Sequence, residues 1–258
     1  MSDFQLEIQK EGLPSVWMYG GGRQSVCIAA LILQGRLPAP DYAAIADTGR
    51  EKSSTWKYLR DIVQPKLPFP IHIVKKSEFA TVDVWGGKEK DTLLIPAYTN
   101  QSGEIGKLET FCSNEWKVRV VDRWLGKRDV SKFIKWIGFS IEEGKRWKPM
   151  KKYHADHVRF PLVDDVPLTA AQAVDLIKEM GWPEPISSSC WMCPNMNDRQ
   201  WKQLTAEEFE QACDFDEWIR LTDPNAYLHK TCQPLRKIKF SDSDTNGGRE
   251  CESGICFV

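Results

Sequence analysis

Two cysteines have the residue type and spacing for metal or sulfur chemistry, and a third has a position that favours its thiolate. Cys190 and Cys193 form a C-x-x-C pair directly before Pro194, and Cys112 stands at the predicted start of a helix. A helix N-terminus stabilises the thiolate, which is the form of cysteine that binds metals, because the helix dipole is positive there. Cys190 and Cys193 are therefore candidate metal ligands, and Cys112 is a candidate thiolate.

A zinc ion is one candidate occupant, with His154 and His157 as further nitrogen ligands. The chain has 258 residues and only 8 cysteines, which are too sparse for a disulfide scaffold. Cys27 and Cys213 fall in apolar helical patterns, so we expect them in the core.

A run of glycines indicates a second kind of chemistry, the binding of an anion. In "WMYGGGRQSVCIAAL" an apolar run ends at Tyr19 and is followed by Gly20, Gly21 and Gly22, and then by a helical pattern. Such a turn leaves backbone N–H groups facing outward at the positive end of the helix dipole. The alternative is a glycine turn that only lets the helix pack against its strand.

Alternating strand and helix patterns must position both groups of residues. We predict helices over residues 24–33, 53–63 and 114–125, and strands over 16–19, up to Asp47, and over 70–76 and 134–138. This alternation predicts an α/β fold, a parallel sheet with helices on both faces. Residues 79–108 show no periodicity and are predicted to form an insertion loop.

The rest of the chain is predicted to be a helical C-terminal part and a flexible tail. Helices are expected over residues 169–180, with Thr169 as the N-cap, and over 198–220. The last residues, "SDSDTNGGRECESGICFV", have the composition of a mobile segment. We therefore expect an α/β domain at 1–160, a helical part with the C-x-x-C at 161–240 and a tail at 241–258.

Composition is that of a globular protein, with 41% hydrophobic and 28% charged residues and a net charge of −1. No run is long enough to cross a bilayer, and residues 1–14 lack the apolar stretch of a signal peptide. We expect a cytoplasmic protein without a membrane partner.

A basic cluster follows the strand predicted at 134–138. Trp147 stands among five basic residues, namely Lys145, Arg146, Lys148, Lys151 and Lys152. This cluster is predicted to be a solvated loop. The alternative is a grip for phosphate, sulfate or a nucleic-acid strand, with Trp147 available to stack on a base.

The glycine run resembles the S-G-G-x-x-S pyrophosphate loop (PP-loop) of the adenine nucleotide α-hydrolase-like superfamily. That superfamily includes N-type ATP pyrophosphatases and phosphoadenosine phosphosulfate reductases. Gly20 replaces the usual first serine, Ser25 matches the last one, and Arg23 and Gln24 stand where the reductases commonly carry Lys and Asp. The resemblance implies a Rossmann-like, HUP-type fold that binds an adenine nucleotide on the loop.

Further segments resemble the reductases in the same order along the chain. "AIADTGRE" resembles their I-D-T-G-E segment, and "WIGFSIEEGKRW" resembles their G-I-R-A-x-E-S-x-x-R segment. By this resemblance the nucleotide-binding residues are Gly20, Gly21, Gly22, Arg23, Gln24, Ser25, Asp47, Thr48, Gly49 and Gly138.

The two cysteine regions also resemble this family. "LETFCSNEWKVRVV", with Cys112 and Lys117, is similar to its C-T-x-x-x-K-x-x-P segment, and Cys190 and Cys193 are similar to its C-x-x-C-P. In adenylylsulfate reductases and related sulfurtransferases these regions hold a [4Fe–4S] cluster, usually with four cysteines. This chain offers three, so either Cys232 or a tail cysteine completes the set, or the fourth iron is open.

The tail partly resembles the E-C-G-L/I-H segment of sulfonucleotide reductases, whose cysteine attacks the sulfur of activated sulfate. By this resemblance Cys251 and Cys256 are candidate catalytic nucleophiles. Alternatively, the two cysteines exchange a disulfide or have no role.

Three functions follow from the resemblance. The first is a phosphoadenosine phosphosulfate reductase-like enzyme that takes electrons from a thiol donor such as thioredoxin. The second is a PP-loop ATP pyrophosphatase that uses Mg²⁺ to adenylate, and then thiolate, a nucleic acid or small molecule. The third is a non-catalytic, zinc-stabilised nucleotide-binding module, which the replacements at Gly20 and Gln24 favour.

Overall fold

The computed structural model describes residues 12–86, 92–154 and 157–241. The predicted nucleophiles Cys251 and Cys256, and almost all of the predicted tail, lie outside the described residues.

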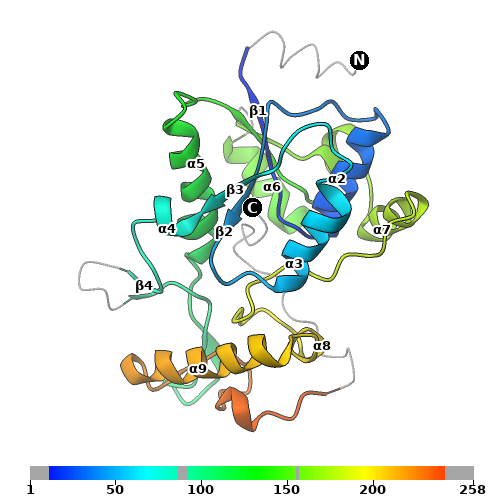
Figure 1. Cartoon of the computed structure of the whole chain (residues 1–258). Helices are drawn as coiled ribbons and strands as arrows, with labels where there is room; N and C mark the ends of the chain where they lie inside the picture. The colour runs from blue at the N-terminus through cyan, green and yellow to red at the C-terminus, as the bar shows by residue number, and fades with distance from the viewer. Residues whose placement is uncertain (1–11, 87–91, 155–156, 242–258) are drawn as a thin grey trace.

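A five-stranded sheet forms the centre of the larger part of the molecule (Figure 1). Its strand order is β3-β2-β1-β8-β9, and every neighbouring pair is parallel. The strands are β1 (Ser15–Met18), β2 (Tyr42–Asp47), β3 (His72–Lys75), β8 (Ile134–Trp136) and β9 (Val158–Arg159). The predicted parallel α/β sheet is confirmed.

Helices cover both faces of this sheet, as predicted. Alternate residues of β1 point to opposite faces, so Trp17 enters one hydrophobic cluster while Val16 and Met18 enter another. The first cluster is completed by α2 (Arg23–Leu33), α3 (Ser53–Tyr58) and α7 (Ala170–Glu179), and the second by α5 (Arg119–Gly126) and α6 (Gly144–His154). Cys27 is fully buried in α2, as expected.

Two predicted helices contain a π-helical segment. Residues 53–63 form α3 followed by a π-helical segment at Leu59–Val63, and residues 114–125 form such a segment at Asn114–Val118 before α5. The α4 helix (Lys76–Phe79) follows β3 directly.

The helix predicted over 198–220 is wrong as a single element. It is two helices, α8 (Asp198–Lys202) and α9 (Ala206–Thr222). The break occurs because Thr205 caps a new helix, accepting a hydrogen bond from the Glu208 N–H while the Glu208 side chain accepts one from the Thr205 N–H. The predicted N-cap at Thr169 is confirmed, with a capping box to Gln172.

A separate hydrophobic core, distinct from the two clusters on the faces of the sheet, lies around α9, below the sheet in Figure 1. We call it the second core. The described part of the segment predicted as an insertion loop belongs to this core, because Val84, Leu93, Ile95 and Ala97 are buried there with Cys213 of α9. It contains β4 (Trp85–Gly86), β5 (Thr92–Leu93), β6 (Tyr98–Thr99) and β7 (Gly106–Lys107), and β6 also pairs with β10 (Ala226–Tyr227). The two-residue strands are too short to give a visible sequence period.

The predicted domain division stays a prediction, although the two cores show how the chain packs. The α7 helix packs against α2 in the sheet part, while described residues between 84 and 116 join residues between 190 and 240 in the second core.

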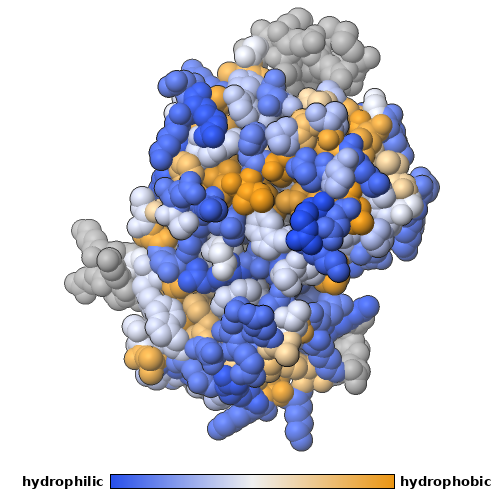
Figure 2. All heavy atoms as spheres, in the orientation of Figure 1, coloured by the Kyte–Doolittle hydropathy of each residue, from blue (hydrophilic) through white to orange (hydrophobic). Residues whose placement is uncertain are grey.

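Figure 2 shows hydrophobic residues across the upper part of the visible face and mostly hydrophilic residues over the lower part.

The basic segment predicted as a solvated loop is a helix, α6, so that prediction is wrong. Trp147 and Met150 pack against the cluster that contains Val16 and Met18 of β1, and this burial holds the segment in a helical conformation.

The remaining short elements are a π-helical turn at Pro161–Asp165 and a 3₁₀ turn at Leu235–Lys237. Within the described ranges, no helix combines the length and apolar composition needed to cross a membrane.

Candidate functional site

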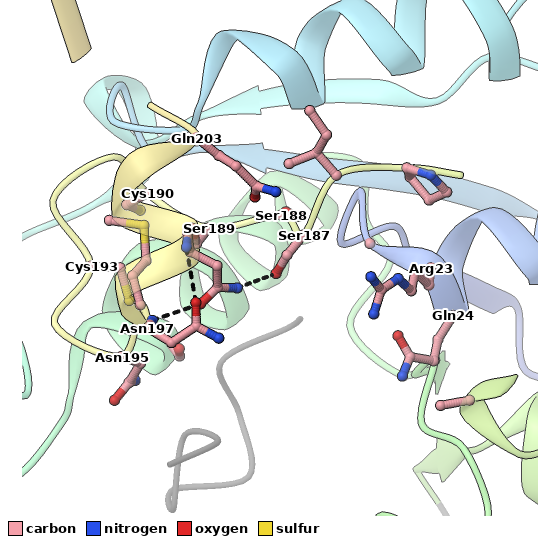
Figure 3. A pocket seen from close by; sticks show the side chains of 18 of the residues that line it. Arg23, Gln24, Ser187, Ser188, Ser189, Cys190, Cys193, Asn195, Asn197 and Gln203 are labelled. Atoms are coloured by element: carbon pink, nitrogen blue, oxygen red, sulfur yellow. Dashed lines mark hydrogen bonds between the residues drawn. The ribbon is translucent and has the colours of Figure 1, made fainter. Parts of the chain in front are cut away.

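A cavity of about 640 Å³ lies where β1 and β8 end and the second core begins. It joins the two groups of residues with which the sequence analysis began: Gly22, Arg23, Gln24 and Gly138 from the nucleotide set, and Cys112, Cys190 and Cys193 from the metal set. In Figure 3, Arg23 and Gln24 lie on one side of the cavity and the two cysteines of the C-x-x-C on the other. Ligand sites in open α/β sheets form at these carboxyl ends of strands.

The glycine run is held in a fixed conformation by its neighbours. Gly21 has φ +74°, and a Cβ there would lie 2.5 Å from Thr55 Cγ2. The Gly20 N–H donates to Ser25 Oγ at 2.9 Å, and Ser188 Oγ donates to the Gly20 carbonyl at 2.6 Å. Only glycine fits at position 21 without displacing α3.

The first turn of α2 is open to the cavity. Gly22 is its N-cap, and no side chain caps the helix. Gly138, directly after β8, passes so close that a Cβ there would lie 3.2 Å from Gln24 Cβ and 3.3 Å from the Ser25 nitrogen. Because residue 138 is a glycine, the chain after β8 can pass close to the first turn of α2, whose backbone N–H groups follow the end of β1.

Two carboxylates, Glu184 and Glu143, contact the side chains that follow the glycine run. Arg23 pairs with Glu184 at 2.8 Å, and both side chains are more than a third exposed. The Gln24 amide donates to Glu143 Oε2 at 3.2 Å, and Glu143 also pairs with Arg146. The carboxylate that the loop lacks at position 24 is thus supplied by a residue 119 positions along the chain.

The β2 turn supports the cysteines rather than lining the cavity. Thr48 Oγ1 lies 3.4 Å from Cys190 Sγ, and Glu51 forms an antiparallel bridge with Cys190. The Gly49 N–H donates to Asp47 Oδ1 at 2.8 Å, so that carboxylate closes its own turn. Among the described residues that line the cavity, Asp47, Thr48 and Gly49 do not occur.

The paired thiols are protonated at neutral pH. Burial, reinforced by the charge of Glu51, raises the pKa of Cys190 to about 12. Burial, reinforced by the charge of Cys112, raises the pKa of Cys193 to about 11. Metal binding here must therefore release protons.

Buried cations stand beside the thiols. Lys117 Nζ lies 3.8 Å from Glu51 Oε2, and the two side chains are only 12% and 3% exposed. Burial alone would lower the Lys117 pKa, but the negative charge of Glu51, joined by those of Cys190, Cys112 and Cys193 when these thiols ionise, outweighs it, and the pKa is raised. Lys52 is 1% exposed, and its Nζ has no hydrogen-bond partner among the described residues. Burial lowers its pKa, against the opposing effect of Glu51.

The other proposed ligands are not brought into the cavity. His154 ends α6, and neither it nor His157 lines the cavity. Cys232 is buried in a left-handed turn and does not line the cavity either. Within the described ranges, no group of three or more His, Cys, Asp or Glu side chains is arranged to hold a single metal ion.

Sequence reasoning missed the polar wall that connects the two ends. It is formed by Ser187, Ser188, Ser189, Asn195, Asn197, Arg199, Gln200 and Gln203. The wall is braced by Gln200, whose amide donates to Ser187 Oγ at 2.8 Å and whose carbonyl accepts from the N–H of Asn197, the N-cap of α8. The signal was the serine run next to the C-x-x-C together with the N-x-x-Q capping box.

A scan of protein-family models, a search of curated proteins and a search of solved structures each found no match to this chain.

Proposed function

We propose that this chain is an enzyme that binds an adenine nucleotide in the cavity and carries out sulfur chemistry on it, the reduction of an activated sulfate. The observation that carries this proposal is the shared cavity, because the end of the glycine loop and three thiols line the same walls. The resemblance to the phosphoadenosine phosphosulfate reductase-like family supplies the identity of the nucleotide.

The loop end would bind the phosphate or sulfate groups. The open first turn of α2 presents backbone N–H groups and a positive dipole end. Arg23 adds a charge that is available to an anion, since its exposed pair with Glu184 contributes little free energy and exchanges readily. The nucleotide would then extend toward the polar wall and the thiols.

The thiol end would hold a [4Fe–4S] cluster through Cys112, Cys190 and Cys193. The donor set fits, because each thiolate of such a cluster binds a different iron and the three sulfurs need not converge on one point. When bound, the cluster supplies charge and an iron site next to the substrate. The buried Lys117 would offset the negative charge of three thiolates.

In the reductase hypothesis, a thiolate of Cys251 or Cys256 attacks the sulfur of the activated sulfate. The sulfur–oxygen bond to the nucleotide phosphate breaks, the nucleotide leaves, and an S-sulfonate forms on the cysteine. A dithiol donor such as thioredoxin then supplies two electrons, which release sulfite and leave the donor as a disulfide.

A second function is favoured by the number of thiols. Only Cys112, Cys190 and Cys193, among the described cysteines, line the cavity, so one iron of a cluster would remain open to bind sulfide. That arrangement suits a PP-loop sulfurtransferase, in which ATP and Mg²⁺ activate an acceptor by adenylation before sulfur is transferred. The acceptor would be a nucleic acid or a small molecule.

Anaerobic purification with iron and sulfide analysis tests the metal assignment. We expect visible absorbance with about four irons per chain, lost in Cys112→Ser and retained in Cys232→Ala. A colourless protein that contains zinc would instead support the non-catalytic module. Loss of iron in Cys232→Ala would contradict the open iron site.

Two assays separate the reactions. Sulfite released from phosphoadenosine phosphosulfate by the holoprotein with thioredoxin would support the reductase. Pyrophosphate released from ATP and Mg²⁺ only when an acceptor is present would support the sulfurtransferase. Nucleotide binding without either product would contradict both enzymes.

A further inference from the structure

One exposed face of α6 carries three lysines in a line. Lys145, Lys148 and Lys152 follow one another at spacings of three and four residues, which places them on one side of the helix. All three are exposed, and none forms an ion pair with another described residue. We call these three residues the lysine stripe.

The opposite side of α6 is anchored, so the lysine stripe has a fixed orientation. Trp147 and Met150 pack into the hydrophobic cluster under the sheet. Arg146 is buried, pairs with Glu143 and stacks over Phe139 at 4.2 Å. Arg146 therefore has a structural role and Lys151 pairs with Asp164, while the lysine stripe faces solvent.

An exposed aromatic ring lies beside the lysine stripe. Tyr153 is 70% exposed, and Lys152 Nζ lies 5.3 Å from the centre of its ring. Tyr153, rather than Trp147, is the aromatic residue available to stack on a base, because Trp147 packs against the core while the Tyr153 ring faces solvent. An exposed ring next to ammonium groups is suited to stack on a nucleobase whose phosphates the lysines neutralise.

The first residue of the lysine stripe is a sequence neighbour of residues that line the cavity. Glu143 and Arg146, at the start of α6, line the cavity, and Lys145 lies between them. A polyanion bound along α6 would therefore have one end at the candidate active site.

We propose that the lysine stripe and Tyr153 bind single-stranded nucleic acid and lead it toward the cavity. Phosphates match the three ammonium groups, which form no ion pair with a described residue, and bases match the exposed ring, whereas an acidic peptide would use only the charges. Delivery to the cavity depends on the proposed function, in its sulfurtransferase form, but binding along α6 does not.

Fluorescence anisotropy with labelled single-stranded RNA and DNA tests the proposal, using the full chain without added nucleotide. Neutralising the lysine stripe, in Lys145→Gln/Lys148→Gln/Lys152→Gln, should weaken binding roughly a hundredfold at about 0.1 M salt. The slope of log affinity against log salt should fall by about 2, because each phosphate contact to a single strand contributes about 0.7.

Matched controls separate this surface from general charge. Lys57, Lys66 and Lys178 are also exposed and form no ion pair with another described residue, so their triple Gln variant should bind like the wild type. Tyr153→Ala should weaken binding several-fold, while Tyr153→Phe, which keeps the ring, should not.

Three results would overturn the proposal: no binding to either oligonucleotide at low salt, equal losses in the two lysine variants, or equally strong competition by poly-glutamate of matched charge. The last result would point to an acidic protein partner instead. Binding of ATP or phosphoadenosine phosphosulfate, measured separately, should be unchanged in the stripe variant. Failure of this surface is thus distinguishable from failure of the nucleotide site.

Discussion

The two ends of the cavity are built in different ways. The loop end is one continuous segment, Gly20 to Ser25, whose backbone conformation would form the proposed anion site, and its charged pair Arg23–Glu184 is open to solvent. The thiol end is assembled from separate segments and contains the buried pair Lys117–Glu51. The loop end depends on backbone shape, and the thiol end depends on compensated buried charge.

This difference predicts which end tolerates substitution. At the loop end a lost side chain is replaced by water, so the fold should change little and ligand affinity should change more. At the thiol end, removal of one charge leaves its partner buried and uncompensated. The substitutions below test this contrast.

The largest effect is expected for Glu51→Gln. The change leaves the Lys117 ammonium without its carboxylate and should lower the free energy of unfolding by about 3 kcal/mol. Urea denaturation of the metal-free protein measures it. The matched change at the loop end, Glu184→Gln, should cost no more than about 1 kcal/mol. Equal losses at the two ends would refute the contrast.

Gly21→Ala should break the loop end through its backbone. Gly21 has a left-handed φ, and a Cβ there would lie 2.5 Å from the Thr55 methyl. We therefore expect Gly21→Ala to lower the free energy of unfolding by about 2 to 3 kcal/mol and to abolish nucleotide binding. Gly35 has a similar φ of +70° but open space around its Cβ position, so Gly35→Ala should cost about 1 kcal/mol and leave nucleotide affinity unchanged. If the two variants behave alike, the close approach to Thr55 is unimportant.

The raised thiol pKa values predict a pH dependence. The pKa of a thiol in the unfolded chain is near 9.0, whereas burial raises that of Cys190 to about 12 and that of Cys193 to about 11. Protonation therefore stabilises the metal-free fold fully below pH 9, and this stabilisation is lost as pH rises from 9 toward 12. Denaturation midpoints should fall more steeply over this range in the wild type than in Cys190→Ser/Cys193→Ser. Parallel curves would show that the thiols ionise normally.

The smallest effect on stability is expected for Arg23→Gln. Loss of an exposed ion pair should change the free energy of unfolding by less than about 1 kcal/mol. Nucleotide affinity should nevertheless fall about tenfold, because a charge-assisted contact to phosphate contributes about 1.5 kcal/mol or more. Calorimetric titration of ATP and of phosphoadenosine phosphosulfate measures it. Unchanged affinity for both would remove Arg23 from the site.

Much of the fold could be predicted because its signals are local. The buried strand before Gly20, the apolar α2 and the Thr169 cap each depend on neighbouring residues, and all three are confirmed. The short strands near Val84 and Ala97 could not be predicted, since they are two residues long and are buried by residues far along the chain, such as Cys213 of α9. For the same reason α6 was missed, because its helix is stabilised by contacts of Trp147 and Met150 with distant residues.

The sequence by itself determined the glycine turn, the order of strands and helices, and the presence of thiols with metal-ligand spacing. These properties follow from backbone preferences and residue types that act over a few positions. Only the tertiary structure decided that the turn and the thiols line one cavity, that Glu143 supports Gln24, and that Lys117 pairs with Glu51. Those contacts join residues far apart in the chain, and they form only when burial of the two hydrophobic cores brings their segments together.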